Sequence, residues 1–261
     1  MARVLVTGSA GFIGFYTALA LLDEGHEVVG VDEFNDYYPV ALKERRHALL
    51  EERKAYHGRR FDLSEADSTE ELFREGEFDV VCHLAAQAGV RYSLLNPKSY
   101  LRSNIEAFLN ILEACRHSKP SPRLVYASSS SVYGGVEELP FSEDQSVDTP
   151  ISFYAASKKS NELMAHTYTH LFGFDTIGLR FFTVYGPFCR PDMMLWKFTE
   201  AVQYGLPLPL YGGGRLQRSF SDIKDIVSGV VAACFSRSIG PYDIFNLGND
   251  ERKTVLEVLE L

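Results

Sequence analysis

Three residues in the middle of this sequence have the types and the spacing to take a proton from an alcohol. Tyr154 and Lys158 are four positions apart, so a helix would place the phenol and the ammonium on one face. A free tyrosine has a pKa near 10 and is a poor base at neutral pH, but a nearby cation favours the phenolate and lowers that pKa. Ser129 could hydrogen-bond the same alcohol oxygen. We therefore expect Ser129, Tyr154 and Lys158 to be catalytic, with hydride leaving the alcohol carbon for a nicotinamide cofactor.

A glycine-rich turn close to the N-terminus could hold such a cofactor. It lies between a β-branched run and a helical pattern, which is the context that a dinucleotide-binding turn requires. Its glycines would allow a tight turn and a close approach to a pyrophosphate, which the first N–H groups of the helix would bind. Asp32 would accept hydrogen bonds from the ribose 2′-hydroxyl and repel a 2′-phosphate, which favours NAD over NADP. The expected cofactor-binding residues here are Gly8, Gly11, Phe12, Ile13, Gly14 and Asp32.

A parallel sheet is the element that can bring these residues together. Short apolar runs alternate with longer helical patterns, which is typical of βαβ units with right-handed crossovers. Strands are expected at residues 3–7, 28–31, 79–84, 123–128 and 176–181, and the main helices at 12–24, 98–116 and 153–172. Ser129 then follows the end of a strand, at the edge where open α/β sheets bind ligands. The predicted fold class is α/β, with a doubly wound parallel sheet.

The pattern changes after Tyr185, where prolines and glycines break it into shorter pieces. We expect residues 1–184 to form a nucleotide-binding domain that includes the catalytic residues, and residues 185–261 to form a smaller substrate-binding lobe. The chain ends at Leu261 inside an expected helix, so this lobe is expected to be truncated. The polar segment 43–60 is mixed in sign, which is typical of a solvated helical face.

Composition excludes several classes of protein. The 261 residues are 46% hydrophobic and 23% charged, which is ordinary for a globular chain, and the net charge of −9 argues against nucleic-acid binding. The apolar runs are too short to span a membrane, and no leader precedes the first strand. The four cysteines are widely spaced, which favours the cytoplasm. His166 and His170 share a helical face without a third ligand, so no metal is expected.

Five segments carry a resemblance to a known family: residues 35–38, 86–92, 154–168, 180–187 and 190–193. At these residues the chain resembles an extended short-chain dehydrogenase/reductase of the sugar-nucleotide epimerase and dehydratase family, over essentially its whole length. Within that family it is most similar to UDP-glucuronate 4-epimerases. The resemblance implies a Rossmann fold, bound NAD, a UDP-sugar substrate, and a homodimer joined by the helices 98–116 and 153–172 of each subunit. It also implies that the family's chain continues beyond Leu261.

The resemblance assigns further site residues. Asp62 and Leu63 would flank the adenine, and Tyr185 would lie against the nicotinamide. The path towards the nicotinamide would be lined by Leu84, Ala85, Ala86, Gln87 and Asn104. The substrate-side candidates are Arg91, Ser130, Thr183, Arg190 and Arg218. Arg190 suits a carboxylate because its guanidinium is planar, whereas Arg218 would meet a diphosphate.

Together these residues predict epimerisation at C4 of a UDP-sugar, most simply UDP-glucuronate to UDP-galacturonate. Tyr154 would remove the 4-hydroxyl proton, a 4-keto uronate would form, and hydride would return to its other face. Because that intermediate is a β-keto acid, Arg190 would have to hold its carboxylate against loss of CO₂. A UDP-glucuronate decarboxylase and a UDP-hexose 4-epimerase stay open as alternatives, as do a catalytically idle NAD-binding protein and an inactive truncated chain. A 4,6-dehydratase is disfavoured because residues 129–131 lack the acidic pair that it needs.

Overall fold

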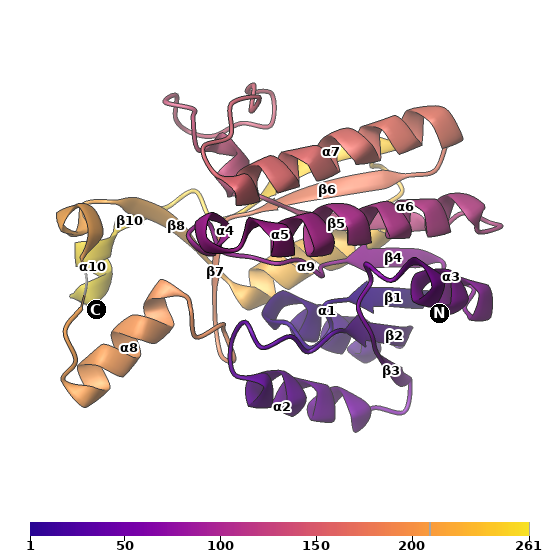
Figure 1. Ribbon diagram of the computed structural model, residues 1–261, viewed down its shortest axis with the longest axis horizontal. Helices are drawn as coiled ribbons and strands as arrows, with labels where there is room; N and C mark the ends of the chain where they lie inside the picture. The colour runs from indigo at the N-terminus through magenta and orange to yellow at the C-terminus, as the bar shows by residue number, and fades with distance from the viewer. Residues whose placement is uncertain (209, 261) are drawn as a thin grey trace.

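A seven-stranded parallel sheet forms the centre of the protein (Figure 1). The computed structural model describes residues 1–208 and 210–260, so Leu261, where the lobe was expected to be cut, lies outside the described residues together with Pro209. The strand order is β3-β2-β1-β4-β5-β6-β9. These strands are β1 (Arg3–Thr7), β2 (Glu27–Asp32), β3 (Tyr56–Arg60), β4 (Val80–His83), β5 (Arg123–Ser129), β6 (Thr176–Phe181) and β9 (Tyr242–Leu247).

Helices cover both faces of this sheet (Figure 1). On one face, α1 (Phe12–Asp23) packs against α2 (Val40–Glu51) and α9 (Ile223–Phe235). On the other face, α6 (Ala107–His117) packs against α3 (Ala66–Glu75) and α7 (Phe153–Phe172). Shorter helical pieces surround the strand ends: α4 (Tyr92–Leu95), α5 (Pro97–Tyr100), the π-helical η1 (Leu101–Glu106) and the 3₁₀ turn η2 (Ser130–Tyr133). The predicted fold class is confirmed.

The strands are buried because their sequences are apolar on both faces. In β1, Val4 and Val6 join the core beneath α1 and α9, whereas Leu5 joins the core beneath α6 and α7. Successive side chains of a strand point to opposite faces, so a continuous apolar run suits a sheet covered on both sides. The strand order reverses between β1 and β4, and this switch point leaves a crevice at the carboxyl ends of the strands.

The predicted elements agree with the structure to within one residue at either end, except in the segment 43–60. There the expectation of one solvated helical face is wrong. Helix α2 ends at Glu51, and β3 pairs with β2 as the edge strand of the sheet. An edge strand tolerates charged side chains because one of its sides is unpaired, which is why Arg59 and Arg60 obscure the strand in the sequence. On α2, Lys43 and Arg46 are buried rather than solvated.

The segment after residue 184 builds a second, small sheet and also part of the main one. The small sheet has the order β10-β8-β7 and contains β7 (Thr183–Tyr185), β8 (Gln217–Asp222) and β10 (Arg252–Thr254). On the same side of the molecule lie α8 (Met194–Tyr204), η3 (Tyr211–Gly214) and α10 (Val255–Leu259) (Figure 1). In contrast, α9 packs on α1, and β9 pairs with β6 in the main sheet. The division into two domains at residue 184 stays a prediction.

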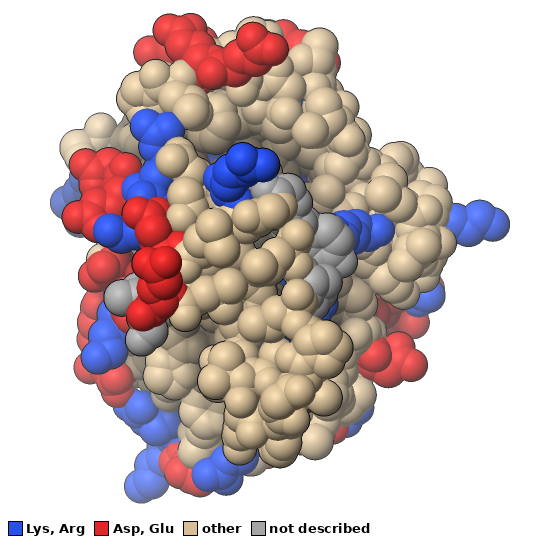
Figure 2. All heavy atoms as spheres, turned by 90° about the vertical axis from the view of Figure 1, so that its left-hand side faces the viewer, with Lys and Arg blue, Asp and Glu red and all other residues tan. Residues whose placement is uncertain are grey.

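The side of the molecule that carries α8 and α10 is mainly uncharged at its centre, and Asp and Glu gather towards its margins (Figure 2). Its exposed apolar side chains include Trp196, Val202, Tyr204, Leu206, Leu216 and Leu256. The net negative charge of the chain is therefore not concentrated here. Among the helices of the described residues, none combines the length and the apolar character needed to cross a membrane.

Candidate active site

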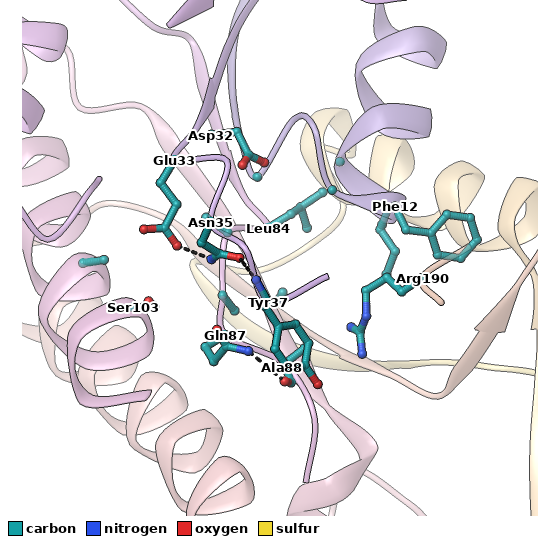
Figure 3. Close-up of a pocket in the computed structure, with 18 of the residues that line it drawn as sticks. Phe12, Asp32, Glu33, Asn35, Tyr37, Leu84, Gln87, Ala88, Ser103 and Arg190 are labelled. Atoms are coloured by element: carbon teal, nitrogen blue, oxygen red, sulfur yellow. Dashed lines mark hydrogen bonds between the residues drawn. The ribbon is translucent and has the colours of Figure 1, made fainter. Parts of the chain in front are cut away.

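A cleft opens at the carboxyl ends of the parallel strands. It is lined by the turn after β1, by the ends of β2 to β5, by α7 and by the segment that follows β6. In Figure 3, Asp32 and Glu33 lie at one end of this cleft, and Arg190 lies on the opposite side of it, across from Tyr37. The cleft brings together most of the predicted site residues: Gly8, Gly11, Phe12, Ile13, Gly14, Asp32, Asp62, Leu63, Leu84, Ala85, Ala86, Gln87, Ser129, Tyr154, Lys158 and Arg190.

Glycine is required in the turn between β1 and α1 and again in the first turn of α1. Gly8 has a φ of +69°, and a Cβ there would lie 2.8 Å from the backbone nitrogen of Ala85. A Cβ on Gly14 would lie 2.1 Å from the carbonyl oxygen of Gly8. Phe12 and Ile13, at the start of α1, line the same cleft, so the first N–H groups of a helix are available to an anion there. The residues of this turn therefore fit the pyrophosphate of NAD.

Asp32 lies at the end of β2 and is held in place by its own backbone surroundings. Its carboxylate accepts hydrogen bonds from the N–H groups of Ala10 (3.1 Å) and Phe34 (2.9 Å), and the residue is 9% exposed. Lys43 lines the cleft nearby, and its Nζ donates to the backbone and side-chain oxygens of Asn35 at 2.7 and 2.8 Å. Burial lowers the pKa of Lys43, although the charge of Asp32 opposes this shift. An oriented carboxylate beside the turn is what recognition of a ribose 2′-hydroxyl requires.

The three predicted catalytic residues lie together in this cleft. Ser129 ends β5, and Tyr154 and Lys158 are one turn apart in α7. Ser152 caps that helix with a backbone hydrogen bond of 3.1 Å. Lys158 is 2% exposed, and its Nζ donates to the carbonyl oxygen of Ala127 in β5 at 2.8 Å. This bond ties α7 to the strand that ends with Ser129, so the phenol is held beside the serine.

Burial sets the protonation of these residues. It lowers the pKa of Lys158 to about 7 and raises the pKa of Tyr154 above its ordinary value. A hydrogen bond with Ser129 and the positive charge of Arg190 act in the opposite direction on Tyr154. The expectation that Lys158 lowers the Tyr154 pKa is therefore wrong for the protein alone, because burial outweighs the effect and Arg190 is the cation that opposes it. Tyr154 is protonated at neutral pH until further positive charge lies beside it.

Arg190 enters the cleft already paired within the chain. Its Nε and Nη2 donate to the carboxylate of Asp192 at 2.9 and 2.8 Å, and the hydroxyl of Tyr37 donates to the same carboxylate at 3.1 Å. Burial alone would raise the pKa of Asp192, but its bonds with Arg190 hold that pKa below its usual range. The pair therefore fixes the direction of the guanidinium and leaves its Nη1 for a ligand.

Six predicted site residues do not line the cleft: Asn104, Tyr185, Arg91, Ser130, Thr183 and Arg218. Asn104 lies behind it, where its amide accepts from the N–H of Gln87 at 2.8 Å and donates to the carbonyl of Gln87 at 3.1 Å. It therefore positions a lining residue. Tyr185 is 37% exposed on β7, and Arg218 on β8 donates to the carbonyl oxygen of its neighbour Gln217. The contacts expected of these six with cofactor and substrate stay predictions.

Several residues that line the cleft were missed from the sequence: Asn35, Tyr37, Tyr38, Lys43, Ser103 and Met193. Among these, the segment 35–38 is marked in the sequence only by the family resemblance. Its two adjacent tyrosines, so close after the acidic end of β2, were the signal that could have placed it at the site. The sequence does not distinguish Lys43 as a site residue, because charged residues follow it directly on the same helix.

The histidine pair on α7 has an explanation in packing. The rings of His166 and His170 are parallel with centroids 6.4 Å apart, and His166 also contacts the ring of Tyr242 edge to face. In the described part of the chain, no group of three His, Cys, Asp or Glu residues is placed to hold a metal ion.

A doubly wound sheet with a glycine turn, an acidic strand end and a Ser-Tyr-Lys trio in one cleft defines a dinucleotide-dependent enzyme. The family is found by comparison with known proteins. The chain belongs to the NAD dependent epimerase/dehydratase family, whose profile matches residues 4–248.

Within this family, the chain is similar to proteins named as UDP-glucuronate 4-epimerases. The chain is 46% identical over 276 residues to UDP-glucuronate 4-epimerase 1 of Arabidopsis thaliana, a match that covers 98% of this chain and 64% of that protein. It is 48% identical over 229 residues to a probable UDP-glucuronate 4-epimerase of Rhizobium meliloti, with coverage of 88% and 67%. Its structure is similar to the crystal structure of UDP-glucuronic acid 4-epimerase from Bacillus cereus in complex with UDP-glucuronic acid and NAD. That match has a TM-score of 0.92 and 36% identity, and covers 99% of this chain and 81% of that one. The predicted family resemblance is confirmed.

Proposed function

We propose that this chain is an NAD-dependent UDP-sugar 4-epimerase that interconverts UDP-glucuronate and UDP-galacturonate. The observation that carries the proposal is a single cleft with the dinucleotide turn at one end, Ser129 and Tyr154 within it and Arg190 at its side. The identity of 44–48% to relatives named UDP-glucuronate 4-epimerase supports the uronate as substrate.

In this proposal Tyr154 exchanges a proton with the sugar 4-hydroxyl. Bound NAD would supply the hydride acceptor for C4 and return the hydride to the opposite face of a 4-keto sugar, so that no net oxidation occurs. Ser129, which lines the same cleft as Tyr154, would hold the same sugar oxygen. Lys158 stays fixed to the carbonyl of Ala127, one helical turn from Tyr154 in α7. The positive charge of Arg190, together with that of a bound nicotinamide ring, would favour the phenolate when a proton is to be taken.

Arg190 would bind the uronate carboxylate. A 4-keto uronate is a β-keto acid, and it loses CO₂ when the bond between C5 and the carboxylate lies perpendicular to the plane of the C4 ketone, because the electron pair of that bond then passes into the carbonyl. A guanidinium that holds the carboxylate away from this geometry would protect the intermediate. Asp192 engages two of the three guanidinium nitrogens, so Nη1 would meet the substrate. The pairing also prevents the long side chain from following a mobile carboxylate.

The test is a product assay. Purified protein with NAD is offered UDP-glucuronate, UDP-glucose and UDP-N-acetylglucosamine, and nucleotide sugars and CO₂ are quantified by chromatography. UDP-galacturonate as the main product supports the proposal. A UDP-pentose with released CO₂ would make the chain a decarboxylase. Binding of NAD without any conversion or binding of a UDP-sugar would make it a catalytically idle NAD-binding protein.

One observation favours a second candidate, epimerisation of a neutral UDP-hexose. Arg190 already has a carboxylate partner in Asp192, so the cleft does not need a substrate carboxylate to balance this charge. The variant Arg190→Ala separates the two candidates. If it retains most of its activity and prefers UDP-glucose to UDP-glucuronate in the same assay, the hexose is the substrate.

We also propose a cytoplasmic homodimer, formed through α6 and α7 as the resemblance implies. Exposed leucines on these helices support it: Leu109 is 40%, Leu163 58% and Leu171 62% exposed. The variant Leu163→Glu should sediment as a monomer, whereas Leu256→Glu, on α10, should not change the mass. An unchanged mass in the first variant counts against this interface.

The proposed location in the cytoplasm is supported by the four buried free cysteines, which are typical of a reducing compartment.

A further inference from the structure

Arg46 is a buried cation that the chemistry described above does not use. It lies on α2, is 0% exposed, and is among the largest fully buried side chains of the protein. Among the residues that the structure describes, no carboxylate lies within ion-pair distance of its guanidinium, and its Nε has no hydrogen-bond partner. An unpaired buried charge is costly, so a side chain of this kind needs a specific reason.

The two terminal nitrogens of the guanidinium bind two segments that are far apart in the sequence. Nη1 donates to the carbonyl oxygen of Ala10, inside the dinucleotide turn, at 2.8 Å and to the hydroxyl of Tyr38 at 2.9 Å. Nη2 donates to the carbonyl oxygen of Phe188 at 2.5 Å. One rigid, planar group therefore joins the cofactor turn to residues 186–193, which we call the Arg190 segment. A lysine has one nitrogen at its end, so it cannot place separate nitrogens against the two carbonyls as the guanidinium does.

The Arg190 segment has little regular structure of its own. Gly186 has a φ of +149° and Phe188 a φ of +58°, which is uncommon for a residue with a side chain. The segment is held on α1 by the edge-to-face contact of Phe188 with Phe15 and by the bond from the Tyr16 hydroxyl to the carbonyl of Pro187 at 3.1 Å. Arg46 adds the bond that aligns the carbonyl two residues before Arg190. The direction of the Arg190 side chain thus depends on a residue of α2.

Arg46 also fixes the dinucleotide turn, through its hydrogen bond to Ala10. Ala10 donates its N–H to Asp32 and accepts at its carbonyl from Arg46, so the turn is held between the carboxylate expected to bind the ribose and this guanidinium. A pyrophosphate on this turn would place negative charge near the buried cation and offset part of its burial cost. Bound cofactor would then strengthen the geometry in which Arg46 also holds Phe188.

We propose that Arg46 is a positioning residue that couples the cofactor turn to the Arg190 segment, so that a dinucleotide bound at the first orders the second. The inference deepens the proposed function, because the segment it orders is the one expected to bind the substrate's charged group. It predicts that NAD binding and substrate binding are cooperative, and that this cooperativity depends on Arg46.

Hydrogen–deuterium exchange with NAD as the only ligand tests the coupling without any assumption about the substrate. In the wild type, saturating NAD should slow amide exchange in residues 186–193 at least about tenfold. In Arg46→Met, also saturated with NAD, that slowing should fall to less than about threefold. The matched control is Arg45→Met, which changes an exposed arginine next to it on α2 and should behave as the wild type. Equal protection of the segment in wild type and Arg46→Met overturns the proposal.

The conservative variant Arg46→Lys guards against a simple loss of folding. It keeps the charge beside the turn, so NAD affinity measured by calorimetry should stay within about threefold of wild type. Because one flexible ammonium would replace the two guanidinium nitrogens that hold the two carbonyls, the protection of residues 186–193 by NAD should still be lost. The proposal is overturned if Arg46→Lys retains full protection. If UDP-glucuronate does not bind to the wild type, the proposed function fails, but the exchange result with NAD alone is unaffected.

Discussion

The buried ion pair between Glu162 and Arg180 allows a strong prediction about what holds the catalytic residues together. Glu162 is on α7, one turn beyond Lys158, and Arg180 is on β6. The guanidinium donates from Nε and Nη2 to the two carboxylate oxygens at 2.8 and 3.0 Å, and the hydroxyl of Ser128 donates to one of them at 2.6 Å. Glu162→Gln removes the negative charge and keeps the shape, so that Arg180 is left buried without a counter-charge.

The structure sets the size of the effect. The side chains of Glu162 and Arg180 are 1% and 3% exposed, so solvent cannot replace the missing charge. Removal of one partner from such a pair costs about 3–5 kcal/mol of unfolding free energy. At about 2–4 °C for each kcal/mol in a chain of this size, the melting temperature should fall by about 6–20 °C. The hydroxyl of Tyr133, which accepts from Arg180 Nη1 at 2.6 Å, is neutral and cannot compensate for the charge.

The assay is urea unfolding followed by circular dichroism, with NAD removed so that ligand binding does not contribute. Glu71→Gln is the control, because the Glu71–Arg74 pair is 60% and 75% exposed and should contribute less than about 1 kcal/mol. The double variant Glu162→Met/Arg180→Met should recover at least half of the loss, since two apolar side chains leave no unpaired charge. A Glu162→Gln protein within about 1 kcal/mol of wild type would refute the reasoning, because it would show that Arg180 does not depend on this carboxylate.

Three further predictions concern the cleft itself. Tyr154→Phe should lower kcat in the product assay by about 10²–10⁴-fold while NAD affinity measured by calorimetry changes little, and a loss below tenfold would exclude the phenol as the acid–base group. Gly14→Ala should weaken NAD binding, measured by calorimetry, roughly 5- to 150-fold. A Cβ placed 2.1 Å from the carbonyl oxygen of Gly8 must displace the turn, at a cost of about 1–3 kcal/mol. Unchanged affinity would mean that the turn does not bind the cofactor. Finally, burial lowers the pKa of Lys158 to about 7, so the unfolded chain binds more protons than the folded one between that pH and the ordinary lysine pKa. In urea titrations without NAD, the unfolding free energy of the wild type minus that of Lys158→Met should therefore increase by about 2 kcal/mol from pH 7 to pH 9. If this difference does not change with pH, the pKa of Lys158 is not lowered by burial.

The elements of the main sheet could be predicted because local sequence determines them. Residues 153–172 form α7 with the predicted bounds, since a serine cap begins the helix and Gly173 ends it with a φ of +75°. The edge strand β3 could not be found in this way. Its charged residues are acceptable only because it pairs on one side, and that pairing is a property of the assembled sheet.

In the candidate site too, the contacts between residues near in sequence could be predicted, whereas those between distant segments could not. The glycine turn, Asp32 and the Ser-Tyr-Lys trio follow from spacing because their partners are near in sequence or on one helix face. The pairing of Arg190 with Asp192 and Tyr37, and the bridge made by Arg46, join segments far apart in the chain. The direction of the Tyr154 pKa was missed for the same reason, because burial depends on the closed cleft and not on the interval between Tyr154 and Lys158.

These long-range contacts explain how a chain with a net charge of −9 can receive an anionic ligand. The cations that line the cleft are already held by oxygens of the protein: Lys158 by the carbonyl of Ala127, Lys43 by Asn35, and Arg190 by Asp192. Behind the lining, Arg46 is held by the carbonyls of Ala10 and Phe188. Such acceptors fix the direction of a cation before a ligand arrives, and carbonyl groups do so without cancelling its charge. In a cleft of low dielectric, an oriented cation acts on a ligand more strongly than a solvated one on the surface. The affinity and the placement of an anion there are therefore governed by these few buried groups, and solvent screens the acidic residues at the margins of the face in Figure 2.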